Sequence, residues 1–563
     1  MYGFSALLGD KIEFLFQLDK HFDTIQTEKA ICYKHMVSKF ENDKVFVNNE
    51  NFILILDGVI LNKKTLDTEK NWVESILKLY RLKGERFFES FRGSFGGLLY
   101  DKQIGKYIIF SDQVGSKFIY YSLNNGSLVC STMMCNIYHF LQENHIHYEL
   151  SIESAYLLLT YGYMLGNRTL CNKIFRLNPG CYLVFQHGEL QEKRYCLLSN
   201  EPDNSLTEAD AIEIYDREFR RAVALEFDKD VEYGYKHLVA LSAGLDSRMV
   251  SWVAHSMGYT DQLNFTFSQS DYWDETVPKQ IARDLKHEWI FKMLDNGLWL
   301  YDIDEITALT GGNILYYGLA HGNSMSKYIN FERLGLMHSG QLSVAISGGY
   351  LIAQEEKKNE LGDGAYSRTH LDRLKNIKLC DYPNQEIARF YNRGFSGMVN
   401  GLLSIMQYTE TCSPFMDWDL MNTVLKVPLK YRFDHYIYKK WILAKYPNAA
   451  NYIWETIGAT IKEPTLKIKG KDRPIKQLPK KVLEKLFHLK TGTQTAKHMN
   501  PIGYYLSTNN ELRKYIMDIL DETNSIIKDA ELRNVINKIK LDGSDIEKIQ
   551  AVSLLRAVRI FFS

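Results

Sequence analysis

Ser242-Ala243-Gly244-Leu245-Asp246-Ser247 is the stretch that decides the fold of most of this chain. The residues before it, 237–241, are apolar and predict a strand, and residues 248–257 predict a helix. In such a turn, Gly244 lets the backbone approach an anion, and N–H groups of the turn and of the helix start point toward it. Ser242 and Ser247 can add hydroxyl donors, and Asp246 offers the carboxylate oxygen that Mg²⁺ prefers. The turn therefore predicts a site for phosphate groups and magnesium.

The alternative interpretation of this turn is an ordinary polar connection that ends in a serine helix cap. Four defined residues in six positions occur by chance at roughly one site in 10⁵. A strand before the turn and a helix after it make a chance match rarer still. We therefore expect the phosphate-binding interpretation to hold.

The pattern on both sides of this turn predicts a parallel sheet. Further strands are expected over residues 263–267 and 289–292, with a helix over residues 276–286 between them. Strand, helix and strand in alternation are typical of a doubly wound α/β fold. A helix is expected from the N-cap residue Thr207 to about residue 227. Beyond residue 366 the chain is predicted to be mostly helical.

The N-terminal third shows a different pattern, with short strands and tight turns. Strands are expected over residues 52–60, 95–100, 106–110 and 118–121, and an amphipathic helix over residues 68–83. This is an α+β layered pattern. The polar segment 198–205 is rich in Pro and Asn and predicts a linker. We expect one domain over residues 1–200 and a second over residues 206–563.

Composition excludes several classes of protein. The chain carries 68 basic and 68 acidic side chains, so it offers no overall attraction to nucleic acid. No run of about 18 apolar residues is present, so no membrane span is expected. The start shows no signal peptide, and the 8 cysteines lack zinc-ligand spacing. The sequence therefore predicts a cytoplasmic protein with reduced thiols.

The turn at residues 242–247 resembles the Ser-Gly-Gly-Leu-Asp-Ser loop with which the asparagine synthetase family holds the pyrophosphate of ATP. Other segments resemble that family in the same order: Tyr272-Trp273-Asp274-Glu275, Ser339-Gly340-Gln341 with Gly348-Gly349-Tyr350, and Glu410-Thr411-Cys412-Ser413-Pro414-Phe415-Met416-Asp417. The resemblance implies that the C-terminal domain is a doubly wound ATP-pyrophosphatase domain, similar to adenine nucleotide α-hydrolases, with helical additions.

The N-terminal third resembles the glutaminase domain of the same family. The similar segments are Leu56-Asp57-Gly58-Val59-Ile60-Leu61-Asn62, Phe91-Arg92-Gly93-Ser94-Phe95 and Asp112-Gln113-Val114-Gly115. This implies an Ntn-hydrolase-like sandwich. Glutamine-hydrolysing members begin Met-Cys-Gly, whereas this chain begins Met1-Tyr2-Gly3. A phenol is a poor substitute for a thiolate, so we expect no glutamine hydrolysis, as in β-lactam synthetases and lasso-peptide cyclases.

A second departure concerns the metal site. Val344 stands where the family has its second magnesium-binding Asp, and valine cannot bind a cation. Asp271, Asp274 and Glu275 are the candidates to replace it. Otherwise Asp246 and the phosphates hold Mg²⁺ alone, or the chain is a non-catalytic scaffold that keeps the fold.

The resemblance assigns roles to individual residues. ATP is expected at Ser242, Gly244, Leu245, Asp246, Ser247 and Phe265, with Asp246 also binding Mg²⁺. The catalytic candidates are Glu410, which would help to activate the nucleophile, and Lys462, which would neutralise the phosphates; Lys467, Lys469 and Lys471 are alternatives to Lys462. Arg248 is expected either to contact phosphate or to lie on the solvent face.

The expected activity follows from these assignments. A carboxylate and ATP would give an acyl-adenylate and pyrophosphate, and ammonia or an amine would then form the amide. The acid is left open among small molecules, peptides and sugars, ordinary ammonia-dependent asparagine synthesis is not excluded, and a homodimer is left open as the assembly. The competing interpretation, the non-catalytic scaffold, rests on Val344.

Overall fold

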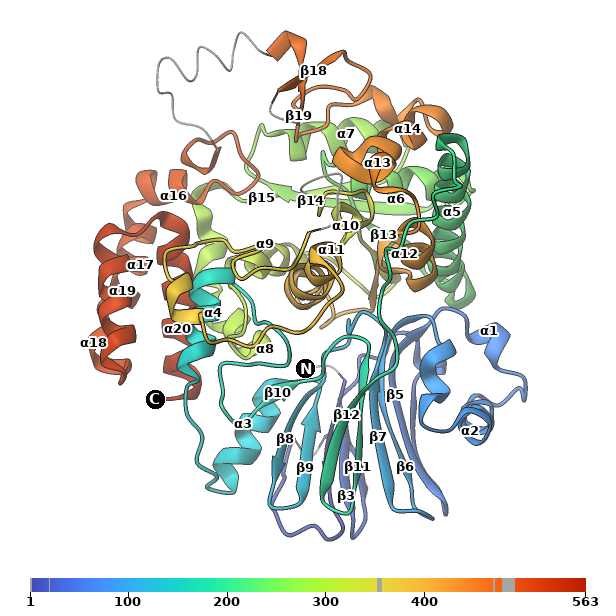
Figure 1. Cartoon of the computed structure of the whole chain (residues 1–563), viewed down its shortest axis with the longest axis vertical. Helices are drawn as coiled ribbons and strands as arrows, with labels where there is room; N and C mark the ends of the chain where they lie inside the picture. Colours follow the sequence, from blue (N-terminus) through green and yellow to red (C-terminus); the bar gives the residue numbers. More distant parts are fainter. Residues whose placement is uncertain (1–2, 20, 352–356, 469–470, 478–491) are drawn as a thin grey trace.

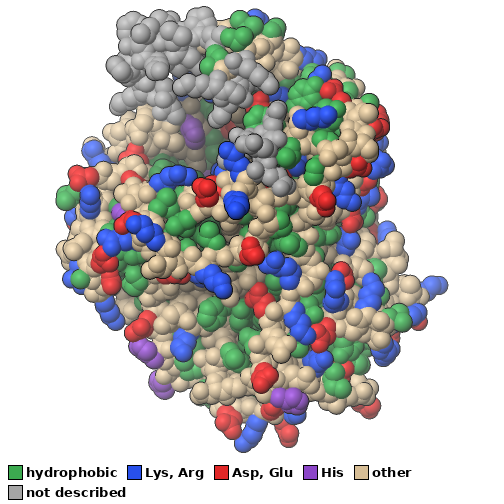
Figure 2. Space-filling model, in the orientation of Figure 1, with side chains coloured by type: hydrophobic (Ala, Val, Ile, Leu, Met, Phe, Trp, Pro, Cys, Tyr) green, Lys and Arg blue, Asp and Glu red, His purple; other side chains and the backbone are tan. Residues whose placement is uncertain are grey.

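The computed structural model of the chain describes residues 3–19, 21–351, 357–468, 471–477 and 492–563. Its N-terminal part is a sandwich of two antiparallel sheets, and its C-terminal part is built around a parallel sheet flanked by helices (Figure 1). Within the described residues, no helix is both long and apolar enough to cross a membrane. On the face shown in Figure 2, acidic and basic side chains are interspersed.

The two sheets of the sandwich have the strand orders β10-β8-β9-β1-β3-β2 and β12-β11-β7-β6-β5-β4. The first consists of β1 Phe4–Leu8, β2 Asp23–Gln26, β3 Ala30–Lys34, β8 Tyr120–Asn124, β9 Ser127–Ser131 and β10 Phe175–Arg176. The second consists of β4 Val45–Asn48, β5 Phe52–Ile60, β6 Gly93–Asp101, β7 Lys106–Ser111, β11 Cys181–Gln186 and β12 Glu189–Arg194. All strand pairs in both sheets are antiparallel.

Alternate side chains of both sheets meet in one apolar core, which includes Ala6, Ile55, Leu98 and Leu183. The opposite face of the β5–β6 sheet is covered by α2 Trp72–Lys83. The sequence therefore predicted the α+β sandwich, the strand β5 and the β6–β7 hairpin correctly. It placed β8 two residues early, at residue 118, and α2 four residues early, at residue 68.

The C-terminal sheet has five strands in the order β15-β14-β13-β16-β17, and every pair is parallel. The strands are β13 Lys236–Ala240, β14 Gln262–Ser268, β15 Glu288–Met293, β16 Leu334–His338 and β17 Thr411–Cys412. The chain adds strands outward from β13 to β15 and then returns to place β16 on the other side of β13. Strand order thus reverses beside β13, which is where doubly wound sheets bind their ligands.

Helices lie on both sides of this sheet (Figure 1). α6 Leu245–Ser256 and α7 Trp273–Leu285 pack against β13 and β14, while α9 Tyr317–Ser326 contacts β14. Because crossovers between parallel strands are right-handed, the reversal after β15 puts α9 on the face opposite α6 and α7. The long helix α5 Glu208–Tyr233 begins at a capping box of Thr207 and Asp210. It starts where predicted and continues six residues beyond residue 227.

The two parts share one continuous apolar core. α3 Met134–Glu143 and α4 Ile152–Tyr161 leave the sandwich and pack against α8 Ile303–Thr310 and α20 Asp545–Phe561. The C-terminal region is mostly helical, as predicted, but it contains the hairpin β18 Thr465–Ile468 and β19 Lys471–Pro474, which the sequence analysis did not predict.

Candidate nucleotide-binding site

A pocket of about 440 Å³ opens at the carboxyl ends of β13, β14 and β16, beside the point where strand order reverses. Pockets for small ligands commonly enclose about 300–1,000 Å³. Its walls include the turn after β13, residues 339–341 after β16, and Glu455 and His498 from the C-terminal region. The residues that line this pocket include Ser242, Gly244, Asp246, Ser247, Phe265, Asp274, Gln341, Glu455 and His498.

The turn after β13 is held in shape by its own serines. The backbone N–H of Ser242 donates to Ser247 Oγ at 2.9 Å, and the N–H of Gly244 donates to Ser242 Oγ at 3.2 Å. The two hydroxyls lie 2.9 Å apart. No side chain caps the N-terminus of α6, and first-turn N–H groups have no partner within a helix. They are therefore available to an anion in the pocket.

Asp246 is placed at this helix start with its carboxylate toward the pocket. Ser343 Oγ donates to Asp246 Oδ1 at 2.6 Å. Loss of hydration raises the pKa of Asp246 to about 6, although the Ser343 hydroxyl lowers it. The positive charge of buried Arg248 also lowers this pKa, but no Lys or Arg of the described residues forms an ion pair with Asp246. A carboxylate without a paired cation is the state expected of a metal ligand before the metal binds.

A pair of carboxyl groups, Asp274 and Glu455, also lines the pocket. Asp274 is buried and accepts the N–H of Ala243 at 2.7 Å, and it hydrogen-bonds to Glu455. Burial and the neighbouring Asp274 and Asp246 raise the pKa of Glu455 to about 8, and burial raises that of Asp274. The two carboxyl groups therefore share a proton near neutral pH.

The pocket is acidic overall, because no Lys or Arg is found among the described residues that line it. Three carboxyl groups without a cation would repel a free nucleotide. A divalent cation bound to carboxylate oxygen would remove that repulsion. The donor set of hard oxygens, together with the uncapped start of α6, fits a magnesium-bound nucleotide.

Val344, which replaces the expected aspartate, lies beside the pocket segment in apolar surroundings. Val344 is partly buried and packs against the apolar core. Its neighbour Ser343 contacts Asp246 instead. Of the carboxylates considered as replacements, only Asp274 lines the pocket; Asp271 and Glu275 lie outside it, where the N–H of Asp271 donates to Glu275 Oε2 at 2.7 Å.

The structure brings most predicted ligand residues together. Ser242, Gly244, Asp246, Ser247 and Phe265 all line the pocket. Leu245 does not line the pocket. It is the first residue of α6, and its side chain is buried in the core. Glu455 and His498 were missed, because they lie in segments without a recognised motif and far from the turn in sequence. Ser343 was also missed, although it precedes Val344 within the recognised segment 339–350, because that comparison drew attention only to the missing carboxylate.

The two catalytic candidates are placed differently from the prediction. Glu410 is fully buried between the two parts of the chain, where its carboxylate binds Lys44 and Lys117 at 2.8 and 2.7 Å. Lys462 is exposed and donates to Asn451 Oδ1 at 2.6 Å. Neither lines the pocket. A glutamate held by two buried lysines is a structural anion, and Lys462 is held by a neighbouring loop side chain.

The alternatives to Lys462 gain no support from their positions. Lys467 and Lys471 belong to the β18–β19 hairpin, and Lys469 lies outside the described residues.

Both expectations for Arg248, contact with phosphate or a place on the solvent face, were wrong. Arg248 neither lines the pocket nor lies at the surface. It is completely buried, and its guanidinium donates to the carbonyls of Ala243 and Ile453 at 2.9 and 2.6 Å. It also donates to the carbonyls of Ala449 and Tyr452. Arg248 therefore ties the turn after β13 to the segment that delivers Glu455.

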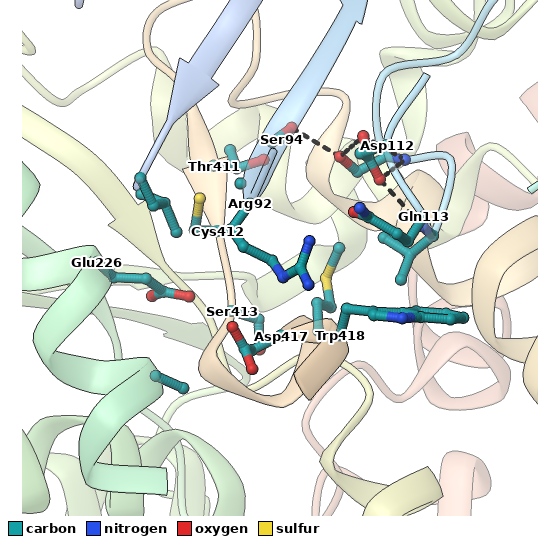
Figure 3. A pocket seen from close by; sticks show the side chains of 16 residues that line it. Arg92, Ser94, Asp112, Gln113, Glu226, Thr411, Cys412, Ser413, Asp417 and Trp418 are labelled. Atoms are coloured by element: carbon teal, nitrogen blue, oxygen red, sulfur yellow. Dashed lines mark hydrogen bonds between the residues drawn. The ribbon is translucent and has the colours of Figure 1, made fainter. Parts of the chain in front are cut away.

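A second, smaller pocket lies between the two parts of the chain (Figure 3). Its charged side chains are all paired within the protein. Arg92 forms two hydrogen bonds with Asp419, Asp417 binds Arg221, and Glu226 binds His338. Asp112 accepts hydrogen bonds from Ser116, which also contacts Ser94. With its charged groups bound by neighbouring side chains, this pocket has the character of a domain interface.

Comparison with known proteins agrees with the sandwich. Residues 41–196 match the family model of a glutamine amidotransferase domain. Amidase chyE of Penicillium rubens is 25% identical over 183 residues, which are 32% of this chain and 25% of that protein. Amidase chry2 of Gibberella zeae is 26% identical over 182 residues, or 32% of this chain and 26% of that protein. The match thus spans about a quarter of the length of these relatives.

Solved structures show only a distant likeness. One of them is glutamine phosphoribosylpyrophosphate amidotransferase from B. subtilis, complexed with ADP and GMP. The match covers 51% of this chain and 59% of that structure's chain, with 10% identity and a TM-score of 0.23. The matched domain and the mixed α/β architecture support an amidotransferase-like family, without pointing to asparagine synthetases in particular. The family match ends at residue 196, before α5 begins.

Proposed function

We propose that this chain is an ATP-dependent amide-forming ligase. A carboxylate attacks the α-phosphorus of ATP, which gives an acyl-adenylate and releases pyrophosphate. Ammonia or an amine then attacks the acyl carbon, and the amide and AMP leave. ATP would lie in the pocket at β13 with its phosphates over the start of α6, and Asp246 would bind the accompanying Mg²⁺.

One observation carries this proposal: an uncapped helix start and an unpaired carboxylate face the same pocket at the reversal point of a parallel sheet. The helix start suits phosphate and the carboxylate suits Mg²⁺. Phe265 and the end of β14 would flank the adenine. Reaction would depend on positioning and on neutralising phosphate charge, since no nucleophilic side chain is required.

The N-terminal similarity supports amide chemistry in general terms. An amidotransferase-like domain and relatives named as amidases fit the making or breaking of an amide bond. Adenylation rests on the C-terminal pocket alone. The competing function, a scaffold that binds nucleotide without reacting, is favoured by Val344, whose side chain is unable to bind metal.

Exchange of labelled pyrophosphate into ATP separates these two functions. With Mg²⁺ and a panel of carboxylic acids, we expect exchange that depends on the acid and is lost in Asp246→Asn. Retained ATP binding without exchange for any acid would favour the scaffold. Val344→Asp is informative in that case, because a restored carboxylate in a degenerate site should bring back metal binding and some exchange.

Glutamine is not expected to supply the nitrogen. Tyr2, which stands in place of the family's cysteine, lies outside the described residues. Burial raises the thiol pKa of seven described cysteines, including Cys412 at the domain interface. Thiolates are the reactive form, so incubation with glutamine should release no glutamate above a blank. Release that persists after replacement of Tyr2 would contradict this expectation.

A further inference from the structure

A side pocket of about 270 Å³ opens off the nucleotide pocket. The two share Gln341 and Met398 in their walls. The side pocket has no part in the ATP site proposed above. Its position beside that site makes it the place from which a second substrate would reach the phosphates.

Both parts of the chain build this side pocket. The C-cap of α4 is Gly162, in the left-handed conformation with φ 74°. Gly162 and the next residue, Tyr163, both line the pocket. The N–H of Leu315 donates to the carbonyl of Gly162 at 3.0 Å, and the N–H of Tyr366 donates to that of Thr160 at 2.9 Å. The end of α4, from the N-terminal part, is thus hydrogen-bonded to two segments of the C-terminal part that line the pocket.

Glycines keep the pocket open. A Cβ atom at Gly397 would lie 3.1 Å from the ring of Tyr163, and one at Gly401 would lie 3.0 Å from Gln341 Nε2. A Cβ atom at either position would therefore crowd the ring of Tyr163 or the side-chain amide of Gln341. The space in front of Tyr163 and Gln341 is therefore a consequence of the sequence at these two positions.

Aromatic side chains give the pocket its character. Tyr163, Tyr317 and Tyr366 line it, and the last two hydrogen-bond to each other. Tyr163 is only 4% exposed, and its hydroxyl has no hydrogen-bond partner among the described residues. Tyrosine faces bind flat rings, and their hydroxyls bind polar groups at a ring edge.

Arg393 supplies the positive charge. It lies on the π-helix η5, Phe390–Gly397, is exposed to solvent, and lines the side pocket. In the part of the chain that the structure describes, its guanidinium has neither an ion pair nor a hydrogen bond. Arg389, one turn earlier, is by contrast held by the carbonyl of Tyr350 and by Asp363. π-Helices occur frequently at functional sites, and a guanidinium fork suits a carboxylate.

We infer that the side pocket takes the acid substrate, and that this acid carries a ring and a second anionic group. The ring would lie against the tyrosines, the second anion would pair with Arg393, and the reacting carboxylate would point past Gln341 toward the nucleotide. Only the assignment of the reacting end rests on the proposed function. Binding of the ring and of the second anion can be tested without ATP.

Calorimetry with two probes tests the assignment. 4-Carboxyphenylacetate carries a ring and two carboxylates, whereas 4-hydroxyphenylacetate carries one carboxylate. The intact chain should bind the dianion at least tenfold more tightly, the size expected of one charge-assisted contact. Arg393→Gln should remove this preference and leave the monoanion unchanged, while Tyr163→Ala should weaken both probes. Arg513→Gln, at an exposed site on α17 Asn510–Asp521, is the matched control.

The outcomes separate this inference from the proposed function. Equal affinity for the two probes, absence of binding by both, or an undiminished preference in Arg393→Gln would overturn the ring-and-anion assignment. Binding of ATP with Mg²⁺ by Arg393→Gln should equal that of the unsubstituted chain, since Arg393 does not line the nucleotide pocket. Loss of probe preference with retained ATP binding therefore supports the side pocket, whatever the fate of the adenylation proposal.

Discussion

Buried charges occur in two regions of this molecule, and their surroundings differ. At the interface of the two parts, Asp57 and Glu410 are matched by Lys44 and Lys117, with all four side chains at most 1% exposed. In the nucleotide pocket, Asp246, Asp274 and Glu455 face a cavity without a lysine or arginine among its described lining residues. The first set is paired within the protein, whereas no ion pair within the described residues matches the second.

The pKa values express the same difference. At the interface, burial alone would raise the pKa of Asp57, but the two lysines outweigh it and lower the pKa. In the pocket, burial raises the pKa of Asp246 to about 6 and that of Glu455 to about 8. A buried anion with its cation contributes to the architecture, whereas unpaired buried acids in a cavity are typical of binding sites. The following substitutions test this distinction.

The largest effect is expected at the interface, on stability. Glu410→Gln leaves Lys44 and Lys117 buried with less opposing charge, and breaking a buried pair costs about 3–5 kcal/mol of unfolding free energy. Denaturant unfolding measures this loss. Glu153→Gln, which breaks an exposed pair with Arg168, should cost at most about 1 kcal/mol.

The same variant checks the earlier assignment of Glu410 as an activator of the nucleophile. Once folded, Glu410→Gln should bind ATP with Mg²⁺ as the unsubstituted chain does. A stable Glu410→Gln chain that has lost acid-dependent exchange would restore the catalytic role.

A second buried network should make stability depend on pH. Burial lowers the pKa of His338, but hydrogen-bonded Asp230 and Glu226 outweigh burial and raise it to about 9. The folded chain then holds a proton that the unfolded chain releases above about pH 6.5. Unfolding free energy should be highest below pH 6.5 and fall by a few kcal/mol as pH rises through 9, at about 1.4 kcal/mol per pKa unit.

Unfolding of His338→Gln between pH 6 and 9.5 checks this dependence. The variant should be less stable at pH 6 and should show a smaller slope. Glu226, whose pKa burial raises to about 7, acts in the same direction at lower pH. His147→Gln, at an exposed histidine, is the control, and an equal slope in all three chains would contradict the charged state of His338.

A smaller effect on stability and ATP affinity is expected at Arg248, which joins the turn after β13 to the segment carrying Glu455. Arg248→Lys retains the charge but loses the fork that binds the carbonyls of Ala243 and Ile453. Unsatisfied buried carbonyls cost about 1–3 kcal/mol. Because this contact also fixes the segment carrying Glu455, ATP affinity should fall together with stability. Unchanged affinity in a destabilised variant would separate Glu455 from nucleotide binding.

Local patterns were sufficient for most of the fold. An apolar run predicted β5, two apolar segments around a turn predicted the β6–β7 hairpin, and Thr207 ahead of Asp210 marked the start of α5. Each of these signals lies within a few residues of sequence. The turn at residues 242–247 was likewise a local signal, and its serines and Asp246 do lie together at a pocket.

Residues brought in from elsewhere could not be predicted in this way. Glu455 reaches the pocket because Arg248 binds the carbonyl of Ile453, a contact between segments more than 200 residues apart. The surroundings of Glu410 could not be predicted for the same reason. Its partners Lys44 and Lys117 come from the sandwich, and no sequence pattern predicts a pairing between the two parts. Neighbours in space, rather than residue type, decide the role of a buried acid.

Calorimetric titration of ATP, with and without Mg²⁺, into the intact chain and into Asp246→Asn tests the central claim most directly. We predict Mg²⁺-dependent binding that Asp246→Asn weakens by roughly tenfold or more, as loss of a charge-assisted contact of about 1.5–3 kcal/mol requires. Asp372→Asn, at an exposed aspartate, should leave the affinity unchanged. Absence of ATP binding, or equal affinity in the Asp246→Asn variant, would contradict the assignment of the pocket.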